Sequence, residues 1–80
     1  MNKKLFVGNL DFDAKDIEVE DLFKTIGNVK TTEIVRFFDK KSKGFGFVEM
    51  DSVEEAKTAM DKLNGAEFKG RKIVVNEARS

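Results

Sequence analysis

The sequence predicts one α+β domain over residues 1–80, with secondary-structure elements in the order β-α-β-β-α-β. Three observations predict this class. Apolar residues alternate with period two in four segments, which is typical of half-buried strands. In two other segments they recur at i, i+3, i+4 and i+7, which is typical of a helix that buries one stripe. Glycine, asparagine and aspartate mark the turns between the segments.

The first predicted strand covers residues 3–9. Its alternation places Leu5 and Val7 against a core, and Lys4 and Phe6 on the opposite face. A half-buried strand is expected to carry polar residues on its non-core face. An aromatic ring at that position needs either a covering layer or a ligand.

The first helix is predicted over residues 16–26, after a polar turn at 9–15. Two apolar members of that turn are expected to pack under the edge of the domain: Leu10 and Phe12. The buried stripe of the helix consists of Val19, Leu22, Phe23 and Ile26. Asp16 is the expected N-cap, because a short acidic side chain can accept from free N–H groups and suits the positive end of the helix dipole.

The second strand is predicted over residues 29–38, followed by a charged hairpin loop at 38–42 that contains Lys40 and Lys41. Thr32 and Ile34 share the core face of this strand. The other face carries Glu33, Val35 and Phe37. We expect Phe38 and Phe68 to be core residues, as phenylalanines in small domains usually are, and leave open whether Phe37 shields an edge or extends an exposed face.

The third strand, Lys43–Met50, organises the rest of the prediction. Lys43, Phe45, Phe47 and Glu49 point to one face of it. The core side is filled by small and aliphatic residues: Gly44, Gly46, Val48 and Met50. Glycine allows a backbone or a flat ligand to approach closely, so we expect these glycines to give the two rings clearance.

The second helix is predicted from a capping box, in which Ser52 is the N-cap and Glu55 lies three residues later, to about Leu63. Its stripe is Ala56, Ala59, Met60 and Leu63. A short turn with a minor strand is expected at 68–70. The last strand covers 73–76, with Val74 and Asn76 on the outward face.

Right-handed crossovers join each βαβ half of this order. The result is a four-stranded antiparallel sheet with both helices on one face, the ferredoxin-like arrangement. The other face stays open and collects three central phenylalanines: Phe6, Phe45 and Phe47. Exposed apolar patches of this kind mark interaction sites, and aromatic rings beside a lysine suit the stacking of nucleic-acid bases.

Composition excludes several classes of function. The chain has no cysteine and no histidine, which removes disulfides, thiolate or imidazole metal sites and the usual nucleophiles and general base. No cofactor is indicated. The net formal charge is zero, but acids gather at 11–21 and bases at 36–43 and 69–72. No apolar run approaches the ~20 residues of a membrane span, so we expect a soluble, cytoplasmic monomer without membrane contact.

The octamer Lys43–Met50 matches the pattern K/R-G-F/Y-G/A-F-V-x-F/Y at seven of eight positions. The first strand supplies a second motif, Leu5-Phe6-Val7-Gly8-Asn9-Leu10. With these motifs the whole chain closely resembles the RNA recognition motif family. Its departure is Met50, where the family prefers an aromatic residue, at a core position. The ending at 75–79 resembles small single-domain members from bacteria and cyanobacteria.

The resemblance implies a non-catalytic module that binds single-stranded RNA with modest affinity and low sequence specificity. Phe6 and Phe45 would each stack on a base, Phe47 would lie between sugars, and Lys43 would contact a phosphate. Further contacts are implied or expected at the residues around the platform: Lys4, Glu33, Val35, Phe37, Lys41, Asn76 and Ala78. The residues leave single-stranded DNA open as the ligand, and they do not indicate a base sequence.

Three alternatives follow from the same residues. Relatives of this fold also bind peptides through the helices, although here the sheet aromatics are intact. Ferredoxin-like domains also include small hydrolases, but no nucleophile–base pair supports that class. A narrow residue alphabet and a zero net charge would also suit an idealised scaffold that keeps the motif.

Overall fold

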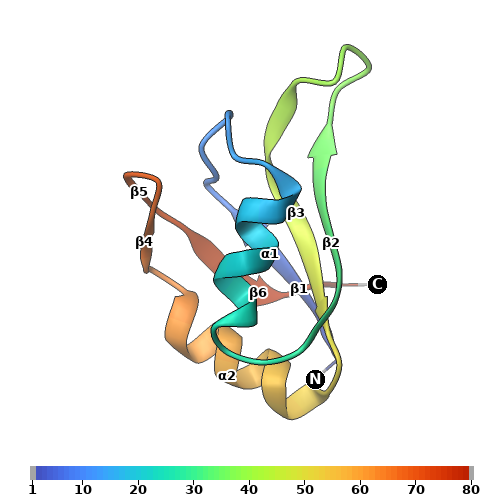
Figure 1. The fold of residues 1–80 in the computed structure, drawn as a ribbon, viewed down its shortest axis with the longest axis vertical. Helices are drawn as coiled ribbons and strands as arrows, with labels where there is room; N and C mark the ends of the chain where they lie inside the picture. The colour runs from blue at the N-terminus through green and yellow to red at the C-terminus, as the bar shows by residue number, and fades with distance from the viewer. Residues whose placement is uncertain (1, 80) are drawn as a thin grey trace.

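The computed structural model describes residues 2–79 and contains the predicted elements in the predicted order (Figure 1). The elements are β1 (Lys4–Gly8), α1 (Asp16–Lys24), β2 (Val29–Arg36), β3 (Ser42–Met50), α2 (Val53–Leu63), β4 (Glu67–Phe68), β5 (Arg71–Lys72) and β6 (Val74–Glu77). Four strands form one antiparallel sheet in the order β2-β3-β1-β6. This is the ferredoxin-like arrangement, as predicted.

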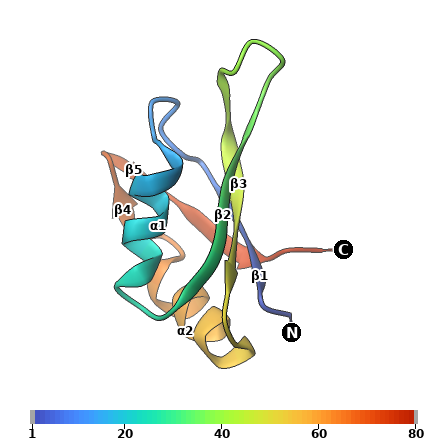
Figure 2. The same ribbon diagram turned by 45° about the vertical axis from the view of Figure 1, so that its right-hand side comes forward.

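Both helices lie on the same side of the sheet, which is seen almost edge-on in Figure 2. The core between the two layers contains the predicted alternate residues of the strands, and Phe23 is its largest fully buried side chain. Leu5, Val7 and Val48 are fully buried there as well. Met50 is also fully buried, so its departure from the aromatic preference is an adaptation of the core. The opposite face of the sheet has no covering element within residues 2–79.

The start of α1 differs from the prediction. Lys15, not Asp16, is the N-cap, with extended φ and ψ of −103° and 155°. The Lys15 N–H donates to the Glu18 carboxylate at 2.9 Å. The Asp16 carboxylate instead accepts from the Ile34 N–H at 3.3 Å and lies 3.7 Å from Arg36. Asp16 therefore joins α1 to β2, a long-range role that helix-capping preferences do not predict. The helix also ends earlier than expected, at Lys24.

The predicted N-cap of α2 is confirmed, and one of the two hydrogen bonds of the predicted capping box is present. Ser52 is the N-cap, and its hydroxyl accepts from the Glu55 N–H at 3.1 Å. The Glu55 carboxylate reaches the Asn28 N–H at 2.5 Å, which ties α2 to the segment that precedes β2. The Ser52 hydroxyl also donates to the Glu55 carboxylate at 2.9 Å. The bond from the Asn28 N–H, and after it the one from the Ser52 hydroxyl, lower the pKa of the Glu55 carboxyl below its ordinary value.

Two boundaries around the β2–β3 hairpin were predicted wrongly. β2 ends at Arg36, and Ser42, expected in the loop, is the buried first residue of β3. Its hydroxyl accepts from the Gly44 N–H at 2.9 Å. A register irregularity between Ile34 and Arg36 accompanies the change. The loop that remains, at 37–41, projects beyond the end of the sheet (Figures 1 and 2).

The expected role of the glycines in β3 was also wrong. A Cβ at Gly46 would collide with the Glu33 carbonyl oxygen and lie 2.8 Å from the Ile34 Cα. Gly44 has a φ of +83°, which favours glycine. Both glycines are therefore required by the protein's own backbone, and clearance for a ligand is not the reason for them.

The segment between α2 and the last strand forms a small hairpin, β4–β5, where a short turn with a minor strand was expected. Lys69 in its turn donates to the Glu18 carboxylate of α1 at 2.9 Å. This hydrogen bond lowers the pKa of Glu18 and raises that of Lys69. β6 then begins at Val74, one residue later than predicted, while Ile73 is buried in the core. Within residues 2–79, the two helices are too short and too polar to cross a membrane.

Candidate nucleic-acid interface

The strand register brings four predicted site residues into one row across the open face. Glu33 on β2 pairs with Phe47 on β3, Phe47 with Phe6 on β1, and Phe6 with Asn76 on β6. The row therefore crosses all four strands of the sheet. Sequence alternation predicted the face of each residue, and the register shows that the four are direct neighbours.

Three rings form a compact cluster on this face. The Phe6 ring centroid lies 5.6 Å from that of Phe45 and 6.0 Å from that of Phe47, and the Phe45–Phe47 distance is 6.2 Å. Phe45 and Phe47 are nearly perpendicular, at 88°. All three side chains are half-buried, so each ring is held by its neighbours and still presents surface to solvent. We call Phe6, Phe45 and Phe47 the ring platform.

Gly8 leaves room for one platform ring. A Cβ at Gly8 would lie 2.7 and 2.8 Å from two carbons of the Phe6 ring. No real Cβ tolerates such contacts, so the Phe6 ring occupies the space that glycine leaves free on the same face of β1. Gly8, the glycine of the motif on the first strand, therefore has a direct structural role in the platform.

Two lysines flank the platform. Lys4 Nζ lies 5.1 Å from the Phe47 centroid, and Lys43 Nζ lies 5.0 Å from the Phe37 centroid. Such cation–π contacts hold an ammonium group beside an aromatic face while leaving it accessible to solvent. The predicted positions of Lys4 and Lys43 beside the rings thus match the structure, although Lys43 contacts Phe37 rather than a platform ring.

Acidic side chains share the face with the lysines. Glu49 pairs across the sheet with Lys4 and with Thr31, and Glu33 pairs with Phe47. Carboxylates at these positions repel phosphates and can accept hydrogen bonds from base edges. Val35, also predicted on this face, is half-buried on β2.

The end of the sheet near β6 differs from the expectation for Ala78. Asn76 is exposed, with its side-chain oxygen accepting from the Glu77 N–H at 2.8 Å. Ala78 is 4 % exposed, its N–H donates to the Lys4 carbonyl, and its carbonyl accepts from the Asn2 side chain. Both main-chain groups of Ala78 therefore already have partners within the protein. The residue still lines a cavity of about 190 Å³ beside Phe47, together with Asn2, Lys4 and Arg79.

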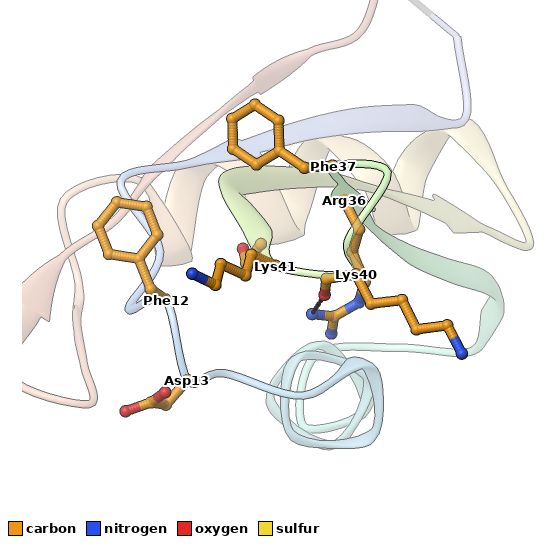
Figure 3. A pocket seen from close by; sticks show the side chains of 7 residues that line it. Phe12, Asp13, Arg36, Phe37, Lys40 and Lys41 are labelled. Atoms are coloured by element: carbon orange, nitrogen blue, oxygen red, sulfur yellow. Dashed lines mark hydrogen bonds between the residues drawn. The ribbon is translucent and has the colours of Figure 1, made fainter.

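A larger cavity of about 560 Å³ lies beyond the other end of the platform (Figure 3). It lies between the loop after β1 and the β2–β3 loop, and is lined by Phe12, Asp13, Arg36, Phe37, Lys40, Lys41 and Ser42. We call it the loop cavity. Lys41 was predicted as a contact residue and lies here. Phe12 and Arg36 were missed, since no local pattern indicates that two loops far apart in sequence meet.

Of four phenylalanines outside the platform, three are exposed and one packs against the core. Phe12 is 61 % exposed and Phe38 is fully exposed, so the expectation that they are core residues was wrong. Phe68 is half-buried and packs against the core. Phe37, left open between two roles, is 56 % exposed and lines the loop cavity.

Residues 2–79 contain no group of three or more acidic side chains placed to hold a metal ion. Instead, the face combines clustered aromatic rings, flanking ammonium groups and hydrogen-bonding side chains. This chemistry suits non-covalent recognition of flat, charged ligands.

Comparison with known proteins agrees with this geometry. The sequence profile of the family "RNA recognition motif" matches residues 5–74. RNA-binding protein CP31B, chloroplastic, of Arabidopsis thaliana is 45 % identical over 76 residues, which cover 94 % of this chain and 26 % of the relative. The chain thus spans about a quarter of that curated relative.

Two solved structures share this fold at lower sequence identity. The crystal structure of RNA Binding Protein PG1 superposes with a TM-score of 0.93 at 32 % identity, covering 99 % of this chain and 96 % of that one. A Sex-lethal protein/RNA complex superposes with a TM-score of 0.96 at 32 % identity, covering 100 % of this chain and 48 % of that one.

Proposed function

Because the chain belongs to the RNA recognition motif family, we propose that it is a non-catalytic module that binds single-stranded RNA on the open face of its sheet. The observation that carries this proposal is the ring platform. Three half-buried phenylalanines lie within 6.2 Å of one another on a face that no element of residues 2–79 covers. The RNA complex of the similar Sex-lethal protein supports the choice of ligand.

In the proposed complex, Phe6 and Phe45 each stack on one base, and Phe47 lies between the neighbouring sugars. The two stacking rings are 5.6 Å apart, so they present adjacent surfaces to successive bases. Each stacked base contributes roughly 1–3 kcal/mol. Lys43 neutralises a phosphate, and Asn76 and Glu33, at the two ends of the row through Phe6 and Phe47, bond to base edges.

The charges of the face favour modest affinity. Glu33 and Glu49 lie among the same residues as Lys4 and Lys43, and the whole chain has no net charge. Few phosphates are therefore neutralised, which predicts a shallow dependence of the binding constant on salt. Stacking on phenylalanine faces tolerates every base, so we propose low sequence specificity.

The test is an NMR titration with a random-sequence pool of eight-nucleotide RNAs. We expect the amide and ring resonances of Phe6, Phe45 and Phe47 to shift. The double variant Phe6→Ala with Phe45→Ala should weaken binding by at least about thirtyfold, since two stacked bases are lost. Phe38→Ala, a fully exposed phenylalanine outside the platform, is the matched control and should bind like the wild type.

Shifts confined to α1 and α2 on addition of a protein partner, with no response to RNA, would reject this function in favour of a peptide-binding domain. A DNA pool of the same length decides between RNA and single-stranded DNA, because only RNA offers a 2′-hydroxyl. We also propose that the protein acts as a monomer. The cytoplasmic location stays a prediction, and the Arabidopsis relative carries the word chloroplastic in its name.

A further inference from the structure

Both edges of the four-stranded sheet have a side chain bonded to an outward backbone N–H. The edge strands are β2 and β6 (Figure 1). On β2, the Ile34 N–H donates to the Asp16 carboxylate of α1 at 3.3 Å. On β6, the Val75 N–H donates at 3.0 Å to the side-chain oxygen of Asn64, the C-cap of α2. An edge strand presents unpaired backbone groups that can pair with another chain, and here each helix supplies a side chain that occupies one of them.

The β2 edge is the longer of the two, with eight residues against four in β6. Its register with β3 is regular from Thr31 to Ile34 and irregular on either side. Residues of an antiparallel pair alternate between exchanging both backbone bonds with the neighbour and pointing both groups outward. Because the Ile34 N–H points outward, that of Thr32 does so too. We call Thr31–Ile34, the regular stretch that can accept another strand, the β2 edge segment.

The side chains of the β2 edge segment suit a second copy of the same segment in one antiparallel register. Pairing centred on Thr32 places Thr31 of each copy opposite Glu33 of the other, where the hydroxyl can donate to the carboxylate. Pairing centred on Glu33 would place two carboxylates opposite each other and is disfavoured. The chain has no net formal charge, so two copies do not repel each other as wholes.

Asp16 stands in the way of this pairing. Its carboxylate accepts from the Ile34 N–H and lies 3.7 Å from the Arg36 guanidinium, which holds it at the edge. A carbonyl oxygen of an incoming strand needs the same N–H and is repelled by the carboxylate. The Asp16 side chain is 52 % exposed, so its replacement leaves the core of the domain intact.

We propose that the β2 edge segment is a latent dimer interface, and that Asp16 keeps it from pairing with the same segment of a second copy. The dimer that Asp16 prevents would join two sheets along their β2 edges, in antiparallel pairing centred on Thr32. Paired residues share a face, so both open faces would lie on the same side. This inference goes beyond RNA binding and gives the proposed monomer a structural cause.

The experiment is sedimentation equilibrium of the wild type and Asp16→Ala over a range of concentrations. The wild type should be monomeric. In Asp16→Ala, two Ile34 N–H groups become available, one on each copy, and the dimerisation constant should rise by roughly five- to hundredfold. Asp21→Ala removes a carboxylate from an exposed position of the same helix and is the matched control. Asp16→Asn keeps an oxygen acceptor for Ile34 and should associate less than Asp16→Ala.

Two further measurements test the register and the location of the pairing. Adding Thr31→Lys to Asp16→Ala places an ammonium group opposite Glu33 of the other copy, twice in the dimer, and should strengthen association by roughly two- to thirtyfold. Amide hydrogen exchange reports on Ile34 directly. Its N–H should be protected at every concentration in the wild type, and only at high concentration in Asp16→Ala.

The outcomes separate this inference from the proposals above. An Asp16→Ala variant that stays monomeric, with its Ile34 amide exchanging freely, would overturn the latent interface and leave the proposed monomer standing. Equal association of Asp21→Ala and Asp16→Ala would overturn it as well, because lost charge alone would be the cause. A dimeric wild type would contradict both the monomer and the role of Asp16. Failure of the wild type to bind the eight-nucleotide RNA pool would reject only the proposed function, since sedimentation decides the edge without RNA.

Discussion

The two faces of the sheet use phenylalanine in opposite ways. Under the helices, Phe23 is fully buried and fills the core between two layers. On the open face, Phe6, Phe45 and Phe47 are only half-buried, and their ring centroids lie within 6.2 Å of one another. The same residue type thus stabilises the fold on one side and forms the proposed recognition surface on the other.

On the proposed function, stability and binding reside on alternate positions of the same strands. On β1, the fully buried Leu5 and Val7 flank Phe6 in sequence, and on β3 the buried Val48 follows Phe47. Because neighbouring side chains point to opposite faces, single substitutions can separate the two properties. The predictions below test that separation, starting with the largest effect.

Phe23→Ala should destabilise the protein most. The ring is fully buried, and replacing a buried phenylalanine with alanine costs about 3–5 kcal/mol. A domain of this size has a free energy of unfolding of roughly 4–12 kcal/mol, so much of its stability would be lost. Urea unfolding followed by circular dichroism measures the change.

Phe45→Ala is the comparison from the open face. Its ring contacts Phe6 and Phe47, and aromatic pairs of this kind contribute about 1 kcal/mol to stability. Its loss of stability, about 1–3 kcal/mol from two such pairs, should therefore be smaller than that of Phe23→Ala. If both variants lost equal stability, the ring platform would be part of the core, and the contrast between the faces would be wrong.

The contrast was largely predictable from sequence because it depends on a local property, the two-residue period of a strand. That period placed Phe6, Phe45, Phe47 and Lys43 on one face and the aliphatic residues on the other. The ferredoxin-like order followed from six segments with distinct periods. What alternation could not supply is the register, which makes Glu33, Phe47, Phe6 and Asn76 one row.

The features missed from sequence all depend on contacts between distant segments. Asp16 bonds to β2 rather than capping its own helix. Phe12 is 61 % exposed and lines a cavity between the loop after β1 and the β2–β3 loop. Gly46 is required by the backbone of β2. Local propensity and periodicity carry no information about such partners.

Two glycine substitutions probe the faces separately. Gly46→Ala places a methyl group against the β2 backbone, which cannot rotate away, so we expect a loss of about 1–3 kcal/mol in stability. Gly8→Ala instead displaces the Phe6 ring on the open face. It should weaken binding of the eight-nucleotide RNA pool by roughly three- to tenfold, part of the contribution of one stacked base.

Each glycine variant serves as the control for the other. Both lose the same backbone freedom on substitution, so the difference between them reports the contact that the new methyl group makes. Unfolding midpoints and RNA affinities are measured for both. A Gly8→Ala variant with wild-type affinity would show that the Phe6 ring does not need its present position.

The smallest expected effect concerns pH and the helical side of the molecule. The Asn28 N–H and the Ser52 hydroxyl donate to Glu55 and lower the pKa of its carboxyl below the ordinary value of 4.5. A lowered pKa means that the ionised form stabilises the folded state above pH 4.5, and that this contribution is lost as pH falls through the folded-state pKa. Thermal unfolding of wild type and Glu55→Gln should therefore differ at pH 7 and converge in acid.

Glu54→Gln is the matched control, because Glu54 is an exposed carboxylate in the same first turn, near the same end of the helix dipole. Its substitution removes one charge without removing the acceptor for the Asn28 N–H. The difference in unfolding temperature between Glu54→Gln and the wild type should thus change less with pH than the same difference for Glu55→Gln. RNA affinity should be the same for both variants at neutral pH, since Glu55 acts between α2 and the segment before β2, away from the rings. A Glu55→Gln variant that weakened RNA binding as much as Gly8→Ala would show that the two faces of the sheet are coupled.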